Sequence, residues 1–192
     1  MFNSTQLTRR DFLLTAGAVA VAPIALLLSH RRSARAATDG EPVNVTIVEF
    51  TDAGVRTGTV TVPKVVKSDD AWRAQLGSDL AFDVARKGGT ERPFSGAYWN
   101  EHGKGLFRCV CCDTALFSST VKFDSGTGWP SFWQPIAEEN VKHGAPSGGY
   151  TNSEVTCRRC DAHLGDLFDD GPKPTGLRYC IDSVSLRFVK AT

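Results

Sequence analysis

Two pairs of cysteines constrain the fold of this chain more than any other feature. Cys109 and Cys112 form one C-x-x-C pair, Cys157 and Cys160 form a second, and 44 residues separate the pairs. Four thiolates at this spacing are a ligand set that zinc prefers, and a closed four-sulfur site is structural. Zinc-finger sites supply about 10–16 kcal/mol, which rivals the stability of a whole domain. We therefore expect one structural Zn²⁺ that joins two distant loops.

Two disulfides are the alternative for these four cysteines, because exported chains commonly carry disulfides. Disulfides within C-x-x-C pairs belong mostly to redox sites, however. Cys111 is an extra thiol inside the first pair. We expect it to be a bystander, since the i, i+3 pair has the better geometry for a metal.

The first 36 residues are predicted to be a twin-arginine signal peptide rather than part of the fold. Arg9-Arg10 precedes an apolar run from Phe12 to Leu28, and Ala34-Arg35-Ala36 is a small-x-small cleavage site. An uncleaved membrane anchor is the alternative, but the run is at the lower limit for a span and Pro23 weakens it as a helix. The expected location is the periplasm, or another compartment outside the bacterial cytoplasm, reached through the twin-arginine export machinery. That route carries folded protein, which favours a metal bound before export over disulfides.

The remaining 156 residues suffice for one domain with its own core. The predicted signal holds five of the 22 basic and one of the 21 acidic residues, so the rest of the chain has a formal charge of −3. This balance provides no basic footprint for nucleic acid or for anionic lipid.

Residues 37–67 are predicted to form a linker and a β-hairpin. Two β-branched runs, 43–50 and 55–62, flank the turn sequence Thr51-Asp52-Ala53-Gly54. Pro63 follows the second run, and proline is typical of an edge strand.

Two short helices are expected next. Ser68 caps the first, which places Trp72 and Leu76 on one face. Ser78 caps the second, which carries Leu80, Phe82 and Val84 and ends at Lys87-Gly88-Gly89. From Leu106 onward the chain shows short strands and Gly/Pro turns. The expected class is a mostly-β domain with a short helical N-terminal portion.

Residues 178–188 are predicted to be one strand with Cys180 at its entry. Alternation places one set of residues toward the core and the intervening set away from it. The first set is Cys180, Asp182, Val184, Leu186 and Phe188, and the second is Ile181, Ser183, Ser185 and Arg187. Cys180 has no cysteine partner at close spacing, so spacing alone leaves two interpretations open. It is either a usable nucleophile near the strand's exposed end or a small buried hydrophobe.

Several long motifs stand in one order along the chain. They are 89–96 (GTERPFSG), 123–132 (FDSGTGWPSF), 160–165 (CDAHLG), 170–172 (DGP), 174–176 (PTG) and the Cys180 strand. Over residues 68–190 the chain resembles the B-type methionine sulfoxide reductases. The resemblance implies a small β-sandwich whose two C-x-x-C pairs hold zinc. It also implies thiol-dependent reduction of the R epimer of methionine sulfoxide in proteins or peptides.

The resemblance also implies roles for individual residues. Cys180 would be the nucleophile and would become a sulfenic acid. Trp129 would form the aromatic wall for the substrate methyl group, and we include Phe132 of the same motif in the expected substrate site. His163 matches the first of the family's two histidines, with an orienting or structural role as the alternative.

Three positions depart from the family pattern. Asp166 stands where the family has a second histidine, Asp182 where it has asparagine, and Asn152 where it usually has arginine. Ionised carboxylates near Cys180 would disfavour its thiolate. Alternatively, the two carboxylates share a proton, and one stays neutral as the acid that protonates the sulfoxide oxygen. We therefore expect His163, Asp166 and Asp182 to belong to the catalytic site. The expected enzyme is a reductase with an altered substrate or a lower rate, and its pH profile is shifted toward acid.

Thr127 occupies the position where some members carry a resolving cysteine. The expected partners are therefore oxidised methionine in proteins or peptides and an external thiol or thioredoxin-like reductant. The protein itself is expected to be a monomer. The competing hypothesis is a zinc-stabilised binding module of the same fold with weakened or lost activity. The presence of Cys180, Trp129 and His163 argues against it, because a module without activity has no chemical need of a nucleophile.

Overall fold

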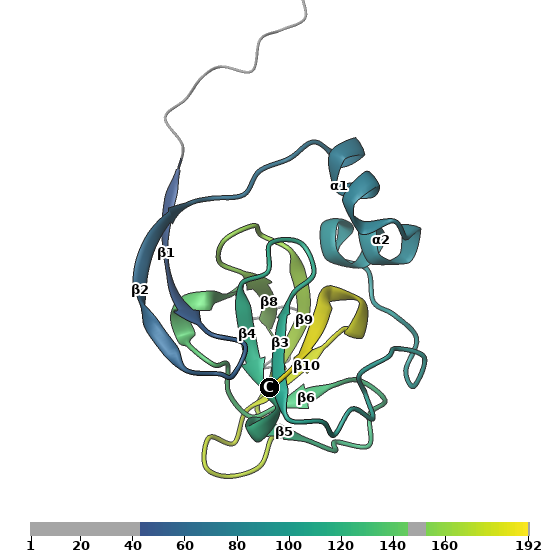
Figure 1. Cartoon of the computed structure of the whole chain (residues 1–192). Helices are drawn as coiled ribbons and strands as arrows, with labels where there is room; N and C mark the ends of the chain where they lie inside the picture. Colours follow the sequence, from purple (N-terminus) through teal and green to yellow (C-terminus); the bar gives the residue numbers. More distant parts are fainter. Residues whose placement is uncertain (1–42, 146–152, 192) are drawn as a thin grey trace, which may run out of the picture. The chain divides into compact units, whose positions relative to one another are not determined.

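The computed structural model describes residues 43–145 and 153–191 (Figure 1). These residues form eleven strands and two α-helices, which confirms the mostly-β prediction. The predicted signal (1–36), residues 37–42 and Asn152 lie outside the described residues. Within the described ranges, no helix is both long and apolar enough to span a membrane.

The strands form three antiparallel sheets. The first is a hairpin of β1 (Asn44–Phe50) and β2 (Arg56–Pro63). The second is ordered β11 (Leu186–Lys190), β3 (Gly105–Cys109) and β4 (Ala115–Ser118). The third is ordered β5 (Lys122–Phe123), β6 (Ser131–Phe132), β10 (Arg178–Ile181), β9 (His163–Phe168), β8 (Ser153–Cys157) and β7 (Val141–His143).

The predicted hairpin is confirmed, and one buried side chain attaches it to the rest of the domain. Ile47 and Val48 of β1 are buried. The amide nitrogen of Asn140 donates to the carbonyls of Val48 and Ala115, both at 2.8 Å, and its oxygen accepts from the Val48 N–H at 2.7 Å. Asn140 thereby connects β1 to the start of β4.

Both predicted helices form with the predicted caps. The Ser68 hydroxyl accepts from the Ala71 N–H at the start of α1 (Asp69–Leu76), and Ser78 does the same for Ala81 in α2 (Asp79–Lys87). Trp72, Phe82 and Val84 are buried as expected. Leu80 lies in α2 as predicted, and it is 48% exposed.

Aromatic rings fill the space between the three-stranded and six-stranded sheets. Phe132 of β6 stacks on Phe117 of β4 with ring centroids 4.4 Å apart, and it meets Phe107 of β3 edge-on at 5.0 Å. Tyr179 of β10 reaches Phe117 at 5.7 Å. All four residues are at most 1% exposed. The core is therefore a sandwich of two sheets.

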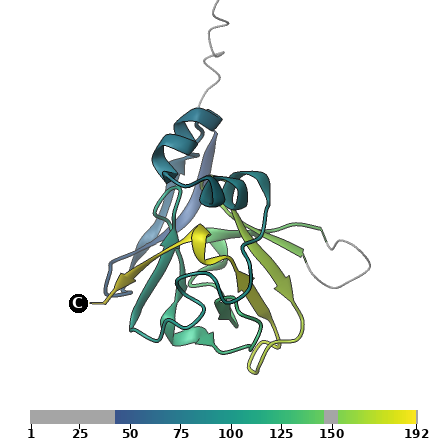
Figure 2. The ribbon, with the colours of Figure 1, turned by 90° about the vertical axis from the view of Figure 1, so that its right-hand side faces the viewer.

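The prediction of one strand over 178–188 was wrong. β10 ends at Ile181, a 3₁₀ turn covers Ser183–Ser185, and β11 then joins the other sheet. Figure 2 shows this yellow segment leaving one sheet through a short coil and entering the other. The Glu91 carboxylate causes the break, because it accepts hydrogen bonds from the N–H groups of Ser183 and Val184 at 2.6 and 3.1 Å. The residues expected to face outward, Ile181, Ser183 and Ser185, are buried at the junction of the sheets.

We predict that Asn140→Ala lowers the free energy of unfolding by about 2–4 kcal/mol. The substitution leaves buried backbone groups of β1 and β4 without partners, and each such loss costs about 1–3 kcal/mol. Urea unfolding of the zinc-loaded protein measures the change. Asn44→Ala, at an exposed position of the same hairpin, is the control and should change stability by less than about 0.5 kcal/mol. Equal stability of the two variants would contradict the role of Asn140.

Candidate active site and metal centre

The four paired cysteines meet at one point between the two sheets. Cys109 ends β3 and Cys157 ends β8, while Cys112 and Cys160 lie in the turns that follow. In each turn the aspartate after the second cysteine, Asp113 or Asp161, has a positive φ. Its N–H returns to the carbonyl of the first cysteine, at 2.9 and 3.0 Å respectively. Aspartate tolerates this left-handed conformation, so both loops are built by one local pattern, Cys-x-x-Cys-Asp.

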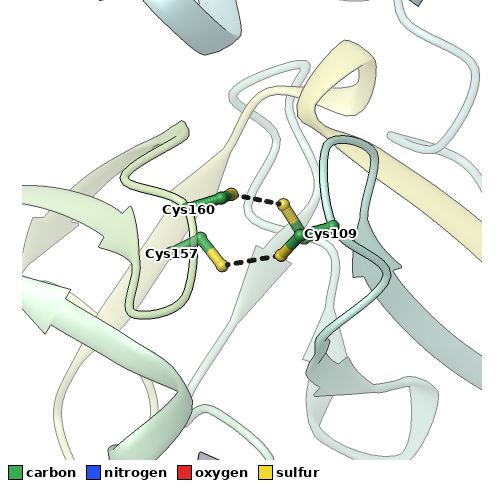
Figure 3. A group of neighbouring side chains, drawn as sticks. Cys109, Cys157 and Cys160 are labelled. Carbon is green, nitrogen blue, oxygen red and sulfur yellow. Dashed lines mark hydrogen bonds between the residues drawn. The ribbon is translucent and has the colours of Figure 1, made fainter. Parts of the chain in front are cut away.

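The sulfur positions fit a tetrahedral metal ion. All four lie within 4.8 Å of one another. The Sγ atoms of Cys109 and Cys160 are 3.6 Å apart, and those of Cys112 and Cys157 are 3.5 Å apart. Figure 3 shows the side chains of Cys109, Cys157 and Cys160 pointing toward one another. Zn–S bonds of about 2.3 Å in a tetrahedron place sulfurs about 3.8 Å apart. All six cysteines, each within the described ranges, are free thiols rather than disulfides. Cys111 is buried and lies outside the group of four.

Cys180 lies at the centre of a polar row that crosses the six-stranded sheet. In β10 it pairs with Ser131 of β6 on one side and Asp166 of β9 on the other, and Asp166 pairs in turn with Glu154 of β8. Residues paired across strands share a face of the sheet. Cys180 is half-buried, so its thiol remains accessible.

Opposing effects act on the Cys180 thiol. Burial raises its pKa above the ordinary value, and the Asp182 carboxylate adds to this rise. The charge of Arg178 and hydrogen bonds from Thr127 and Arg178 lower the pKa. A bidentate pair with Asp170, at 2.7 and 2.8 Å, holds the Arg178 guanidinium, which also stacks 4.3 Å from the centre of the Phe168 ring. Arg178 and Thr127 therefore favour the thiolate, but they do not cancel the effect of burial, and the pKa of Cys180 stays above its ordinary value.

Arg178 was missed in the sequence analysis, although a signal was present. It precedes Cys180 by two residues on the same strand, so alternation places both side chains on one face. A guanidinium on the face of a candidate nucleophile stabilises the anionic form.

His163 and Asp182 form the acidic side of the site. Nδ1 of His163 lies 2.8 Å from Oε1 of Glu154, and Nε2 lies 3.9 Å from Oδ2 of Asp182. Asp182 is 2% exposed. Burial raises the pKa of Asp182 to about 6, and the charges of Glu91 and Asp166 add to this rise. The hydrogen bond from the Glu91 N–H and the charge of His163 act in the opposite direction. Burial also raises the pKa of Asp166, with His163 opposing and Glu154 adding.

Glu91 is the second residue that the sequence analysis missed. Besides the 3₁₀ turn, its backbone N–H donates to Asp182 Oδ1 at 2.9 Å and its carbonyl accepts from Trp129 Nε1 at 3.1 Å. It is 2% exposed. A buried carboxylate of this kind carries no local sequence signal, because its partners lie about 40 and 90 residues away.

The structure brings Trp129 to the Cys180 site but places Phe132 elsewhere. Trp129 is half-buried, and it lies between Thr127, which contacts the thiol, and Ser131, which pairs with Cys180. Phe132 is fully buried in the core. Because side chains alternate along β6, Ser131 faces Cys180 and Phe132 faces the opposite way. Phe132 has no surface for a substrate in this structure, so we withdraw it from the expected substrate site.

A cavity lies elsewhere among the described residues. It has a volume of about 730 Å³ and is lined by loop residues between Glu101 and Leu106, by Ser118–Asp124 and by the β1–β2 turn. It contains none of the site residues described above. The candidate active site is therefore identified by the chemical groups around Cys180, and not by this cavity.

Comparison with protein-family models matches residues 78–190 to the SelR domain. The chain belongs to this family, that of the B-type methionine sulfoxide reductases. Among curated proteins, it is 55% identical over 126 residues to the peptide methionine sulfoxide reductase MsrB of Herminiimonas arsenicoxydans, covering 65% of this chain and 91% of the relative. It is 50% identical over 129 residues to the protein of that name from Synechococcus sp. (strain RCC307), covering 67% and 94% respectively.

All four paired cysteines lie inside the matched SelR domain. Because their sulfur atoms are placed to hold one metal ion, we predict that each of them is needed for metal binding. Cys157→Ser should remove bound zinc and lower the melting temperature by more than 10 °C, since a metal ligand and the connection between two sheets are lost together. Zinc analysis of the purified protein and a thermal scan measure both effects. Cys111→Ser is the matched control and should retain full zinc occupancy. Zinc loss in Cys111→Ser, or zinc retained in Cys157→Ser, would contradict the assigned ligand set.

Proposed function

We propose that this protein reduces methionine (R)-sulfoxide in proteins or peptides to methionine, with Cys180 as the nucleophile. The observation that carries the proposal is the environment of that thiol: Arg178 and Thr127 stabilise its anion, and the Trp129 loop lies beside it. Membership of the SelR family and the names of its relatives support the same activity. Membership of this family does not favour the alternative of a binding module without activity, which only the departures at Asn152, Asp166 and Asp182 suggest.

The first step transfers oxygen from the substrate to the enzyme. The Cys180 thiolate attacks the sulfoxide sulfur, one proton is delivered to the oxygen, methionine leaves, and the hydroxyl remains on Cys180 as a sulfenic acid. The substrate sulfur is reduced by two electrons and the Cys180 sulfur is oxidised by two. An ordinary thiol is only a few per cent ionised at pH 7, and the pKa of Cys180 is raised further by burial, so Arg178 and Thr127 offset only part of the cost of forming the thiolate.

Asp182 is the group best placed to supply the proton. Its pKa of about 6 leaves a substantial neutral fraction in mildly acidic solution, and it lies near both His163 and Cys180. A proton donor is most effective when its pKa is close to the working pH. Above pH 6, ionised Asp182 both ceases to donate and disfavours the thiolate. We therefore propose an acid-shifted reductase, with Asp166 and His163 setting the charge around Asp182.

The four paired cysteines would hold one structural Zn²⁺, which supplies no step of the reaction and contributes only to stability. Cys109, Cys112, Cys157 and Cys160 would be its ligands. The fit of the sulfur distances to a tetrahedral ion supports this assignment.

Regeneration of Cys180 requires an external reductant. Thr127, rather than a cysteine, contacts the thiol, and the other five cysteines are the four paired thiols and the buried Cys111. The sulfenic acid would therefore condense with a thiol of a thioredoxin-like donor, releasing water. A second donor thiol would then reduce the mixed disulfide.

Export through the twin-arginine route to the periplasm remains part of the proposal. Arg9-Arg10, the apolar run and the Ala34-Arg35-Ala36 motif support it.

The test of the activity uses the reduced, zinc-loaded protein and the separate R and S epimers of N-acetyl-methionine sulfoxide. With dithiothreitol as donor, we expect methionine derivative to form from the R epimer only. Cys180→Ser should reduce turnover by at least about a thousandfold, because the nucleophile is absent. Cys111→Ser should retain full activity. Turnover of neither epimer by the unaltered protein would overturn the proposed function.

The role of the carboxylates is tested by the double variant Asp166→His/Asp182→Asn. At pH 7.5 the variant should turn over several-fold faster than the unaltered protein, because the charge opposing the thiolate is removed. As pH falls through about 6 this advantage should shrink, since Asp182 of the unaltered protein takes up its proton there. The pH dependence of Cys180 alkylation by iodoacetamide should show a lower thiol pKa in the variant. Asp169→Asn, at an exposed position, is the control. The proposed role of the carboxylates would be refuted if the double variant were no faster than the unaltered protein at pH 7.5. It would also be refuted if the ratio of the two rates were the same at pH 5.5 and pH 7.5.

A further inference from the structure

Two aromatic rings are exposed next to the active-site loop. Phe94 is 55% exposed and Trp99 is 36% exposed, whereas every other phenylalanine, tyrosine and tryptophan in the described ranges is buried or half-buried. The two rings meet edge-to-face, with centroids 5.3 Å apart and planes at 81°. Exposed apolar surface of this kind is uncommon away from binding sites when it is contiguous.

Contacts with Gly128 connect this aromatic pair to the loop beside Cys180. The Phe94 N–H donates to the Gly128 carbonyl at 2.8 Å. The Phe94 ring lies so close to Gly128 that a Cβ there would stand 2.8 and 2.9 Å from two of its ring carbons. Gly128 lies between Thr127, which contacts Cys180, and Trp129. The aromatic pair therefore continues the surface of the substrate site beyond the Trp129 loop.

The surrounding structure holds both residues in place. Phe94 has a φ of 63°, a left-handed conformation that costs a bulky residue about 1–3 kcal/mol and persists only when neighbouring contacts impose it. The carbonyl of Trp99 accepts a hydrogen bond from Lys122 Nζ at 2.9 Å. A surface ordered in advance loses less conformational entropy when a ligand binds.

We propose that the Phe94–Trp99 pair binds the polypeptide that flanks the oxidised methionine, and that it favours extended segments with an apolar residue near that methionine. The inference rests on the proposed function and specifies its substrate class. When the sulfoxide reaches Cys180, neighbouring residues of the substrate pass over the Thr127–Trp129 loop, at about 3.3 Å per extended residue. Aromatic rings provide a large apolar contact area with little loss of side-chain entropy.

A second copy of this chain is a poorer occupant for the pair. Two aromatic side chains bury about 150–250 Å² each when fully covered, whereas a stable protein–protein interface buries at least about 1,200 Å² in total. A short polypeptide segment needs no more area than the pair and the adjoining site provide.

The experiment compares a minimal substrate with a polypeptide substrate. The substrates are N-acetyl-methionine-(R)-sulfoxide amide and two nine-residue peptides with a central (R)-sulfoxide, flanked by leucine in one and by glycine and serine in the other. The variants are Phe94→Asn, which keeps a residue that accepts the left-handed backbone, and Trp99→Ser. Leu80→Ser removes a comparable exposed apolar side chain from α2 and is the matched control.

For both aromatic variants, kcat/KM on the leucine-flanked peptide should fall about three- to tenfold. The change on the minimal substrate should be less than twofold, and that on the glycine–serine peptide should be intermediate. Leu80→Ser should leave all three values unchanged. An equal fall on all substrates, or no fall on the leucine-flanked peptide, would overturn the inference. So would a dimer of the unaltered protein in sedimentation that Trp99→Ser dissociates without changing the ratio of kcat/KM values. If the unaltered protein reduces none of the substrates, the proposed function itself fails.

Discussion

The structure depends on the meeting of four sulfur atoms between two sheets. One C-x-x-C-Asp turn extends from the three-stranded sheet and the other from the six-stranded sheet. The two sheets otherwise pack through a small aromatic core, and small cores provide limited stability. A metal held by sulfurs from both sides would fix the spacing of the sheets independently of that core. The catalytic strand β10 lies in one of these sheets, and its continuation β11 lies in the other.

Glu91 performs a related task where β10 ends. A single buried residue holds the 3₁₀ turn after Cys180, the carboxylate of Asp182 and the indole of Trp129. The nucleophile, the proposed proton donor and the proposed substrate wall are thus positioned through one side chain and its backbone. Preorganisation of this kind is what a reaction needs when its groups come from distant parts of the chain.

Opposing charges surround Cys180. Arg178 and Thr127 favour the thiolate, whereas burial and Asp182 oppose it. Burial also raises the pKa values of the two carboxyl groups, Asp166 and Asp182. A buried carboxyl can remain protonated in mildly acidic solution, which is the basis of the proposed acid-shifted activity.

Features with a local physical cause could be predicted from the sequence. The hairpin follows from β-branched runs around a turn, the two helices from serine caps and glycine ends, and the four-sulfur site from paired cysteines. The family motifs also identified Cys180, His163, Asp166 and Asp182, which the fold brings together. Features caused by distant contacts could not be predicted. Period-two alternation at 178–188 suggested one strand, but Glu91, about 90 residues earlier, ends that strand.

The sequence by itself determined most of the short segments and the candidate residues for the chemistry, because caps, turns and metal-ligand spacing act within a few residues. Only the tertiary structure decided which side chains share the site. It turned Phe132 into the core, joined Glu91 to Asp182 and Trp129 by hydrogen bonds, and left Phe94 and Trp99 exposed. Burial and contacts between distant segments set these positions and the pKa values that depend on them. Neither can be calculated until the sheets are packed.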